Sequence, residues 1–513
     1  MLQRKTRQKG ILLIFILILV IALNGILYAA KDKYPVPKEQ NPLILQAFYW
    51  EMGTGKFGKM YPEEKDLWQL LAKRAPEFSD LGFTGIWLPP AGKGTSISDV
   101  GYGIYDPWDL GEFNQKGTVR TKYGTKKELL KAINTLQQKG ISVYYDVVFN
   151  QRIGADHKEE VPLAGGGTME TWTLFSGMKG RNKYYDQAKE WGWDWQCFDG
   201  IDVDASGKMI GPTLFQGKSW DQSFDKDYLL GCDVDYQNEK VVDEAIAWGK
   251  WLLKETGVDG FRLDAVKHVD TGFVKRWLEE IQASTEKELF IVGEAWYTNV
   301  MSLQFYLGAL NNKEVKLFDF PLRAQMELMR DGRINMANLG TAGLVNKKPE
   351  QAVTFVDNHD TFRDGLNSAP IFKRKCQSYA YILTREHGYP VVFWRDLYNA
   401  NLRSEMEKII KARKYFAYGP GYEVENNDQE VYSYVRAGLE DVDGTGLVMM
   451  ISSGDSGEII EKRINSRQPG QIYYDFTGNS SEFVETDSQG YGNFKVKNTA
   501  EHGWSIWVPK KRD

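Results

Sequence analysis

Short apolar segments alternate with longer amphipathic segments over most of this chain. Runs rich in Val, Ile, Leu and aromatic residues are candidates for buried strands. They cover residues 43–48, 84–89, 141–148, 260–263, 289–292, 315–320, 352–356 and 390–394. Between them lie segments such as 65–81 and 126–138, whose apolar residues recur at helical spacing. This alternation predicts parallel strands, and eight of them predict a closed (β/α)8 TIM barrel of the α/β class.

Two regions depart from the alternation. Residues 151–235 are rich in Gly, Trp and Asp and are too long and too aromatic for a plain loop, so we expect a subdomain inserted after strand 3. Beyond Gly419, short strand patterns separated by Gly, Asn and Asp turns predict a C-terminal all-β domain. The expected organisation is a leader (1–30), a barrel (31–417) interrupted by the insert (151–235), and a C-terminal β-sandwich (418–513).

The N-terminus carries a targeting pattern. Arg4, Lys5, Arg7 and Lys9 precede an uncharged, mostly apolar run over residues 10–30. A basic flank followed by an apolar core is typical of a secretory signal, and the run is also long enough to span a bilayer. We expect a secreted, extracellular protein with a cleaved signal. The alternative is a retained anchor, in which case this segment alone contacts the membrane and the rest of the chain faces outside.

Composition narrows the class of protein further. The chain has 513 residues, of which 42% are hydrophobic, 26% charged and 13% aromatic, as in a folded globular protein. Its net charge is −5 and basic residues form no run beyond the N-terminus, so we expect no nucleic-acid partner. Cys197, Cys232 and Cys376 cannot all pair within one chain, which argues against a disulfide framework.

Acidic residues gather at the predicted strand ends. Asp146 lies in the third run, Asp264 ends the fourth and Glu294 follows the fifth, while Asp357 and Asp360 follow the seventh. In such barrels the active site lies at the C-terminal ends of the strands. Several carboxylates that converge on one mouth are electrostatically costly without a function. The pattern therefore predicts an active site built from these acids.

Carboxylates in unequal environments are what glycosidic cleavage requires. One protonates the leaving oxygen, and another attacks or stabilises the oxocarbenium-like carbon. Arg262 shares a strand face with Asp264 and is expected to keep that acid ionised. Glu294 is flanked by the apolar residues Ala295 and Trp296 and is better placed to hold a proton. These residues favour a sugar hydrolase, while proton abstraction in a metal-dependent barrel enzyme stays open on the same grounds.

Four ordered sequence blocks add a family resemblance. They are DVVFN (146–150), GFRLDAVKH (260–268), GEAW (293–296) and FVDNHD (355–360). With them the chain resembles the α-amylase family of glycoside hydrolases (family 13) from about residue 42 to residue 509, and it is similar to secreted bacterial and archaeal α-amylases. The resemblance implies a monomer that hydrolyses internal α-1,4-glucosidic bonds of starch, glycogen and maltooligosaccharides by a retaining double displacement.

The resemblance also implies residue roles. Asp264 would be the nucleophile, Glu294 the general acid/base, and Asp360 a third carboxylate that helps to distort the sugar. Further substrate-binding residues would be Tyr102, Gln151, Arg262, Lys267, His268 and His359. Gln151 stands where the family has histidine, and an amide can form hydrogen bonds but cannot carry charge. We therefore expect activity that is retained but reduced, or shifted in its pH profile.

Ion sites follow from the same resemblance. A structural Ca²⁺ would be held by Asn150, Asp227, Asp233 and the backbone carbonyl of His268, and a second metal ion by Asp199, Asp221 and Asp235. Oxygen ligands of this kind suit calcium. Gln237 stands where relatives place another Asp, which weakens the case for a further calcium. Chloride is a further hypothesis at Arg262, Asn358 and Arg395, although an ordinary salt bridge at Arg395 is the alternative that we favour.

Two other functions compete with this interpretation. A relative of the same fold could transfer glycosyl units or cleave α-1,6 bonds. A membrane-anchored, non-catalytic ectodomain with an amylase-like fold is less favoured, because Asp264, Glu294 and Asp360 are all present.

Overall fold

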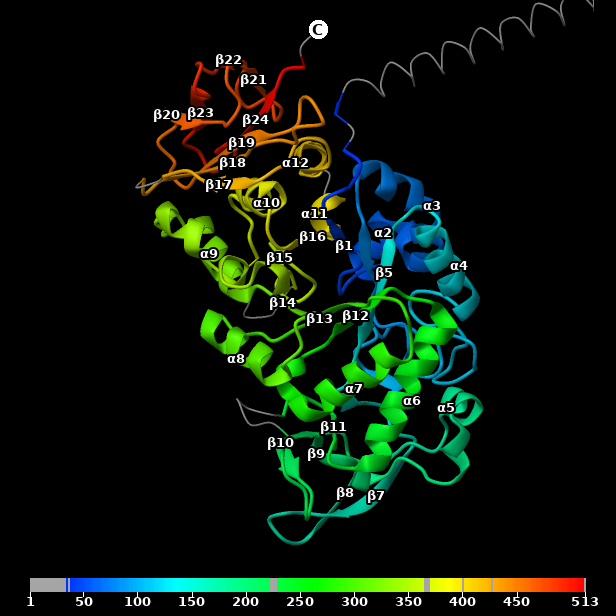
Figure 1. The fold of residues 1–513 in the computed structure, drawn as a ribbon. Coiled ribbons are helices and arrows are strands. Elements are labelled where there is room, and N and C mark those ends of the chain that lie inside the picture. The colour runs from blue at the N-terminus through cyan, green and yellow to red at the C-terminus, as the bar shows by residue number, and fades with distance from the viewer. Residues whose placement is uncertain are drawn as a thin grey trace, which may run out of the picture.

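A closed barrel of eight parallel strands forms the centre of the molecule (Figure 1). The computed structural model describes residues 34–35, 37–221, 228–363, 370–398, 401–425 and 428–511. Around the barrel the strand order is β1-β16-β15-β14-β13-β12-β5-β2. These strands are β1 (Ile44–Gln46), β2 (Gly85–Trp87), β5 (Ser142–Val147), β12 (Gly260–Leu263), β13 (Phe290–Gly293), β14 (Val315–Phe318), β15 (Ala352–Phe355) and β16 (Tyr389–Phe393). Each overlaps one of the predicted runs, so the predicted TIM barrel is confirmed.

Helices alternate with the barrel strands along the chain (Figure 1). The longer ones are α3 (Leu67–Leu81), α4 (Lys126–Gln137), α6 (Glu239–Thr256), α7 (Thr271–Ala283), α8 (Val300–Leu310), α9 (Phe320–Arg330), α10 (Lys375–Thr384) and α12 (Arg403–Tyr415). Shorter ones are α2 (Gly55–Met60), α5 (Lys179–Tyr184) and α11 (Trp394–Leu397), with 3-10 turns at η1 (Pro62–Asp66), η2 (Asp186–Lys189), η3 (Trp195–Cys197), η4 (Val266–His268), η5 (Met336–Thr341), η6 (Leu344–Asn346) and η7 (Pro349–Gln351). Local sequence sets their ends: Thr125 and Glu128 form a capping box at the start of α4, and Gly82 ends α3 with a left-handed φ of +96°.

The segment between β5 and α6 forms the predicted insert, at the bottom of Figure 1. Its antiparallel sheet has the order β10-β9-β11-β6, and β7 pairs with β8 as a hairpin. The strands are β6 (Gln151–Arg152), β7 (His157–Pro162), β8 (Thr168–Leu174), β9 (Phe198–Val203), β10 (Met209–Leu214) and β11 (Cys232–Val234), and a further pair, β3 (Lys93–Gly94) and β4 (Ile104–Asp106), precedes α4. The backbone N–H of Val234 donates to the carbonyl of Asn150 at 3.0 Å, so the insert ends beside its own start.

The C-terminal region is all-β, as predicted. A six-stranded antiparallel sheet has the order β17-β18-β19-β24-β21-β22, and β20 pairs with β23. The strands are β17 (Gly421–Glu423), β18 (Val431–Arg436), β19 (Leu447–Ser452), β20 (Ile459–Asn465), β21 (Ile472–Asp475), β22 (Phe483–Glu485), β23 (Tyr491–Lys497) and β24 (Trp504–Pro509). They enclose a core of their own that includes Val448, Phe494 and Trp507. The exact residue boundaries of the predicted domains stay a prediction.

The predicted leader, residues 1–30, lies outside the described residues. Within the part of the chain that the structure describes, no helix is both long and apolar enough to cross a membrane. The location of the protein therefore stays a prediction from the sequence of residues 10–30.

Candidate active site

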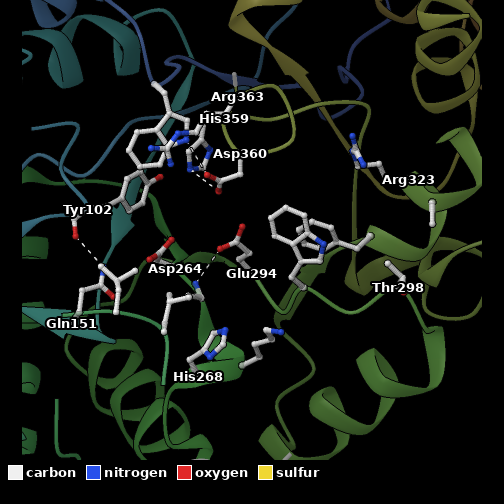
Figure 2. Close-up of a pocket in the computed structure, with 18 of the residues that line it drawn as sticks. Tyr102, Gln151, Asp264, His268, Glu294, Thr298, Arg323, His359, Asp360 and Arg363 are labelled. Carbon is white, nitrogen blue, oxygen red and sulfur yellow. Dashed lines mark hydrogen bonds and ion pairs between the residues drawn. The ribbon is translucent and has the colours of Figure 1, made fainter. Parts of the chain in front are cut away.

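A cavity of about 760 Å³ lies where the barrel strands end (Figure 2). Asp264, Glu294 and Asp360 all line it, although they come from three separate parts of the chain. Asp264 follows β12, Glu294 follows β13, and Asp360 comes shortly after β15. Barrel closure therefore brings the three predicted acids together at one mouth. The predicted residues Tyr102, Gln151, Lys267, His268 and His359 line the same cavity.

Arg262 contacts three acids of the site. Its side chain is fully buried, with Nη1 2.5 Å from Asp264 Oδ1 and 2.7 Å from Asp146 Oδ1, and with Nη2 2.7 Å from Glu294 Oε2. Strand register explains part of this arrangement, because Arg262 on β12 is directly paired with Asp146 on β5. One guanidinium thus faces three carboxyl groups in a site that is shielded from water. Such a group of charges perturbs the protonation of every acid in it.

Burial raises the pKa of both Glu294 and Asp264, and the Arg262 guanidinium opposes both shifts. Burial, together with the charges of Asp264 and Asp360, raises the pKa of Glu294 to about 8, although Arg262 acts in the opposite direction. Glu294 is therefore protonated at neutral pH. Burial raises the pKa of Asp264 as well, but the guanidinium 2.5 Å away opposes that shift. The Oε2 atom of Glu294 accepts from the backbone N–H of Ala265 at 3.1 Å, while its buried Oε1 has no hydrogen-bond partner among the described residues.

Asp360 is held by hydrogen bonds to both of its oxygens. The indole Nε1 of Trp50 donates to Oδ1 at 2.9 Å, and His359 Nε2 lies 3.2 Å from Oδ2. The amide of Gln46 donates to His359 Nδ1 at 2.8 Å, so the ring proton lies on Nε2 and points to Asp360. Burial, with the charges of Arg262 and Arg363, lowers the pKa of His359 well below its ordinary value. His359 is therefore a neutral donor.

Aromatic rings form one wall of the cavity. The ring of Tyr102 is parallel to that of His359, with centroids 5.2 Å apart, and Trp50 lies 5.4 Å from Tyr102. The Tyr102 hydroxyl donates to Asp146 at 2.8 Å, and Gln151 Nε2 donates to the Tyr102 carbonyl at 2.9 Å. Gln151 thus steadies the backbone of the residue whose ring faces the cavity.

The sequence search missed several cavity residues. Trp50 and Arg363 line the cavity, and Arg323 and Glu327 line it from α9, whereas Gln46 acts through His359. Trp50 is not an acid and so was not among the candidates at the strand ends. Its position shortly after β1 nevertheless places it at the same end of the barrel as those acids. Conversely, the strand-end acid Asp357 is buried outside this cavity. Its carboxylate lies 2.9 Å from Arg323 and 3.0 Å from Lys375.

Oxygen ligands suitable for a metal ion lie in the insert. Asp199, Asp221 and Asp235 each offer a carboxylate oxygen, and these atoms lie within 4.8 Å of one another. Asn150 is buried between β5 and β6, and within the described residues its side-chain amide has no hydrogen-bond partner. This donor set fits a hard cation such as Ca²⁺. The ammonium group of Lys218 contacts Asp235, so a metal ion bound at this cluster would compete with Lys218 for that carboxylate.

The other predicted calcium ligands are only partly described. Asp233 on β11 is paired with Gln151 on β6, and Asn150 directly precedes β6, so two of the predicted ligands lie at this strand pair. His268 lies in η4, while Asp227 falls outside the described residues. The backbone N–H of Gln237 donates to Asp235 Oδ1 at 2.8 Å. The assignment of calcium to this set stays a prediction.

The chloride hypothesis is not tested by the structure. Arg395 lies over Phe362 and Phe57 at 4.3 and 4.4 Å, and its Nη1 is 3.9 Å from Glu51. The side-chain oxygen of Asn358 accepts from the backbone N–H groups of Asp360 and Thr361. Chloride at Arg262, Asn358 and Arg395 stays a prediction.

Comparisons with known proteins agree with this geometry. The family described as "Alpha amylase, catalytic domain" matches residues 69–396, and "Alpha-amylase C-terminal" matches residues 447–508. The α-amylase of Geobacillus stearothermophilus is 39% identical over 501 residues, which cover 92% of this chain and 87% of that protein. The glucan 1,4-α-maltohexaosidase of Bacillus sp. (strain 707) is 35% identical over 538 residues, covering 99% and 100% of the two chains.

A solved structure shows the same fold. α-Amylase I of Eisenia fetida, a mutant in complex with maltohexaose, superposes with a TM-score of 0.61 at 15% identity, covering 93% of this chain and 100% of that one. At that identity the likeness concerns the fold alone. The family match and the 39% identity together show that the chain belongs to the α-amylase family of glycoside hydrolases.

Proposed function

We propose that this enzyme cleaves internal α-1,4-glucosidic bonds of starch and related α-glucans with retention of anomeric configuration. Asp264 is the nucleophile, Glu294 the general acid/base, and Asp360 the third carboxylate that binds and distorts the sugar. One observation carries the proposal: the buried Arg262 contacts both Asp264 and Glu294 at the wall of one cavity. The carboxylate and the carboxylic acid that a retaining hydrolase needs are thereby placed together.

In the first step, an oxygen of Asp264 attacks the anomeric carbon while Glu294 gives its proton to the leaving glycosidic oxygen. The carbon–oxygen bond breaks, and a glycosyl ester forms on Asp264. Glu294 is then ionised and takes a proton from the incoming water, whose oxygen attacks the anomeric carbon from the face that the leaving group occupied and breaks the ester bond to Asp264. The raised pKa of Glu294, about 8, supports its role as the acid of the first step.

The cavity walls position the sugar around this bond. We assign the Tyr102 ring to stacking beneath the sugar at the point of cleavage, and His359 Nε2–H to a donor role beside Asp360. Gln151 takes the place of the family histidine at the same wall. Lys267 and His268 line the cavity and contact the leaving-group side in this proposal.

Calcium is proposed as a structural ion of the insert. The residues that would hold it are Asn150, Asp233, Asp227 and the carbonyl of His268, and a second ion would lie at the cluster of Asp199, Asp221 and Asp235. When bound, calcium would join the insert to the barrel and so stabilise the cavity wall that carries Gln151.

We also propose that the enzyme acts outside the cell as a monomer. Support for export comes from the basic residues and the apolar run at the N-terminus. N-terminal sequencing of protein recovered from the culture medium tests this proposal: a start after residue 30 supports cleavage, and retention of the full chain in membranes supports an anchor.

Reducing-sugar release from soluble starch tests the function. The wild type is compared with Asp264→Asn, each with calcium and with excess chelator, and pullulan is offered in parallel. We expect wild-type activity on starch, a loss of about 1,000-fold or more in Asp264→Asn, and weaker activity with chelator. Starch activity retained in Asp264→Asn would contradict the assigned nucleophile. Cleavage of pullulan in place of starch would favour an α-1,6-acting enzyme. Products longer than the maltooligosaccharides supplied would favour a glycosyl transferase.

A further inference from the structure

Arg363 is a cation at the wall of the active-site cavity, and the bond cleavage proposed above does not use it. Its side chain lines the cavity and is exposed. Figure 2 shows Arg363 beside His359 and Asp360, on the opposite side of the cavity from His268. Because we assign His268 to the leaving-group side, Arg363 faces the part of the glucan that stays on the enzyme in the first step.

Trp50 orients the Arg363 side chain. The guanidinium carbon lies 4.0 Å from the centroid of the Trp50 ring, which is a close cation–π contact. Trp50 is itself fixed at two points: its indole Nε1 donates to Asp360 Oδ1 at 2.9 Å, and its carbonyl accepts from Lys122 Nζ at 3.2 Å. The guanidinium therefore packs on a fixed surface at the edge of the cavity.

Within the described residues, the Arg363 guanidinium forms no ion pair and donates no hydrogen bond. The two other arginines of the site differ in this respect, since Arg262 contacts three carboxylates and Arg323 contacts two. Arginine carries five N–H donors in a planar fork that matches the oxygens of a phosphate or a carboxylate. Arg363 thus presents an oriented positive charge with unused donors to the space where a substrate binds.

A phosphate monoester on a glucosyl unit has the chemistry that this group can recognise. It carries a charge of about −1.5 to −2 at pH 7 and three acceptor oxygens, which accept paired hydrogen bonds from arginine. Neutral sugar hydroxyls do not neutralise a cation, whereas a phosphate group does. The adjacent acid Asp360 does not occupy the guanidinium, because Trp50 Nε1 and His359 Nε2 lie at its two oxygens.

We propose that Arg363 binds a phosphate monoester carried by a glucosyl unit of the substrate, on the side of the cleaved bond that stays with Asp264. The guanidinium donates to two phosphate oxygens, and Trp50 is a positioning residue that holds it in place. This inference rests on the proposed function and adds phosphorylated α-glucans to its substrates. Inorganic phosphate offers the same oxygens, so the experiment must separate the ester from the free anion.

Two substrates of equal length separate anion binding from bond cleavage. One is maltoheptaose, and the other is maltoheptaose with a single 6-phosphate on an internal glucosyl unit. The quantity compared is the ratio of kcat/KM on the phosphorylated substrate to kcat/KM on the neutral one, at constant ionic strength. The variants are Arg363→Gln and Arg363→Lys. The matched control is Arg467→Gln, because Arg467 is also exposed and stacked on an aromatic ring, 4.3 Å from the Tyr422 centroid in the C-terminal region.

We expect Arg363→Gln to lower this ratio roughly tenfold, as for the loss of a charge-assisted hydrogen bond, whatever its effect on neutral maltoheptaose. Arg363→Lys keeps the charge but loses the planar fork, so its ratio lies between those of the Gln variant and the wild type. Arg467→Gln has the wild-type ratio. Mass spectrometry finds the phosphate on the fragment that carries the new reducing end.

An unchanged ratio in Arg363→Gln, or an equal fall in Arg467→Gln, would overturn the phosphate-ester site while the hydrolase stands. Inorganic phosphate might act alone: inhibition of maltoheptaose cleavage in the wild type but not in Arg363→Gln, with an unchanged ratio, would assign the guanidinium to the free anion and overturn the proposal. A wild type that leaves maltoheptaose uncleaved would overturn the proposed function and this site with it.

Discussion

The Arg262 guanidinium lies 2.5 Å from the Asp264 carboxylate, and both side chains are buried at the end of β12. Two residues with one residue between them on a strand share a face, which is why the pair forms. The same guanidinium reaches Glu294 at 2.7 Å, so the ion pair belongs to the same group of charges as the second acid. In the mechanism that we propose, this salt bridge holds the nucleophile in place.

Replacement of Arg262 tests this arrangement. Arg262→Met leaves Asp146, Asp264 and Glu294 buried without their shared cation. Loss of one partner of a buried ion pair costs about 3–5 kcal/mol, so we expect the free energy of unfolding to fall by that amount and activity to be lost. Denaturant titration and a starch assay measure the two effects. Arg262→Lys keeps the charge and is the control; equal stability of the Met variant and the wild type would contradict the account.

The pH dependence of kcat/KM reports the protonation of Glu294. Activity should fall as pH rises through about 8, where Glu294 loses its proton. The negative charge of Asp360 raises this pKa, so Asp360→Asn should lower it and move the alkaline limb to lower pH. This variant leaves the rest of the Glu294 environment unchanged, including Asp264, Arg262 and the backbone N–H of Ala265. The residual kcat/KM of the variant on a fluorogenic substrate, measured from pH 5 to 10, locates the alkaline limb. A shift of this limb to higher pH would contradict the prediction.

Gln151→His introduces the side chain that the resemblance to the family leads us to expect at this position. The amide of Gln151 donates to the Tyr102 carbonyl but cannot ionise, whereas histidine can. We expect higher turnover or a shifted pH optimum in the histidine variant. Steady-state rates on starch across the pH range decide this, and an unchanged turnover together with an unchanged optimum would refute it.

Removal of calcium should destabilise the protein. An ion present at about 100 times its Kd contributes about 2.7 kcal/mol, which corresponds for a chain of this length to a decrease in Tm of about 2–3 °C when chelator is added. Calorimetry with calcium and with chelator measures the change. Asp199→Asn should reduce the difference, because Asp199 belongs to the acidic cluster of the insert. The same Tm in both buffers would argue against a structural ion.

The sequence predicted the barrel strands and the three acids at their ends better than it predicted the residues around those acids. The eight strands were recognisable because buried parallel strands are continuous apolar runs, and the strand ends then indicated Asp264, Glu294 and Asp360. Asp357 and Asp360 are equivalent by position, yet only Asp360 faces the cavity, since Arg323 and Lys375 hold Asp357 elsewhere. Contacts of this kind depend on side-chain packing between distant segments.

Trp50 and Glu327 are cavity residues that the sequence did not indicate. Trp50 donates to an acid 310 residues away, and Glu327 reaches the cavity from a helix face that looks like ordinary charged surface in the sequence. The sequence signal for Trp50 is its place after the first strand, whereas Glu327 could not be assigned without the closed barrel. The metal cluster is intermediate, because its acids are conspicuous in the sequence but only the fold brings Asp199, Asp221 and Asp235 within 4.8 Å.

Trapping of the glycosyl-enzyme intermediate tests the central claim most directly. A 5-fluoro glycosyl fluoride slows the second step, and peptide mass spectrometry after rapid denaturation then locates the bound sugar. The account predicts the added glycosyl mass on the peptide that carries Asp264, and none on this peptide in Asp264→Asn. A label on Asp146 or Asp360, or turnover without a covalent intermediate and with inverted product, would contradict it.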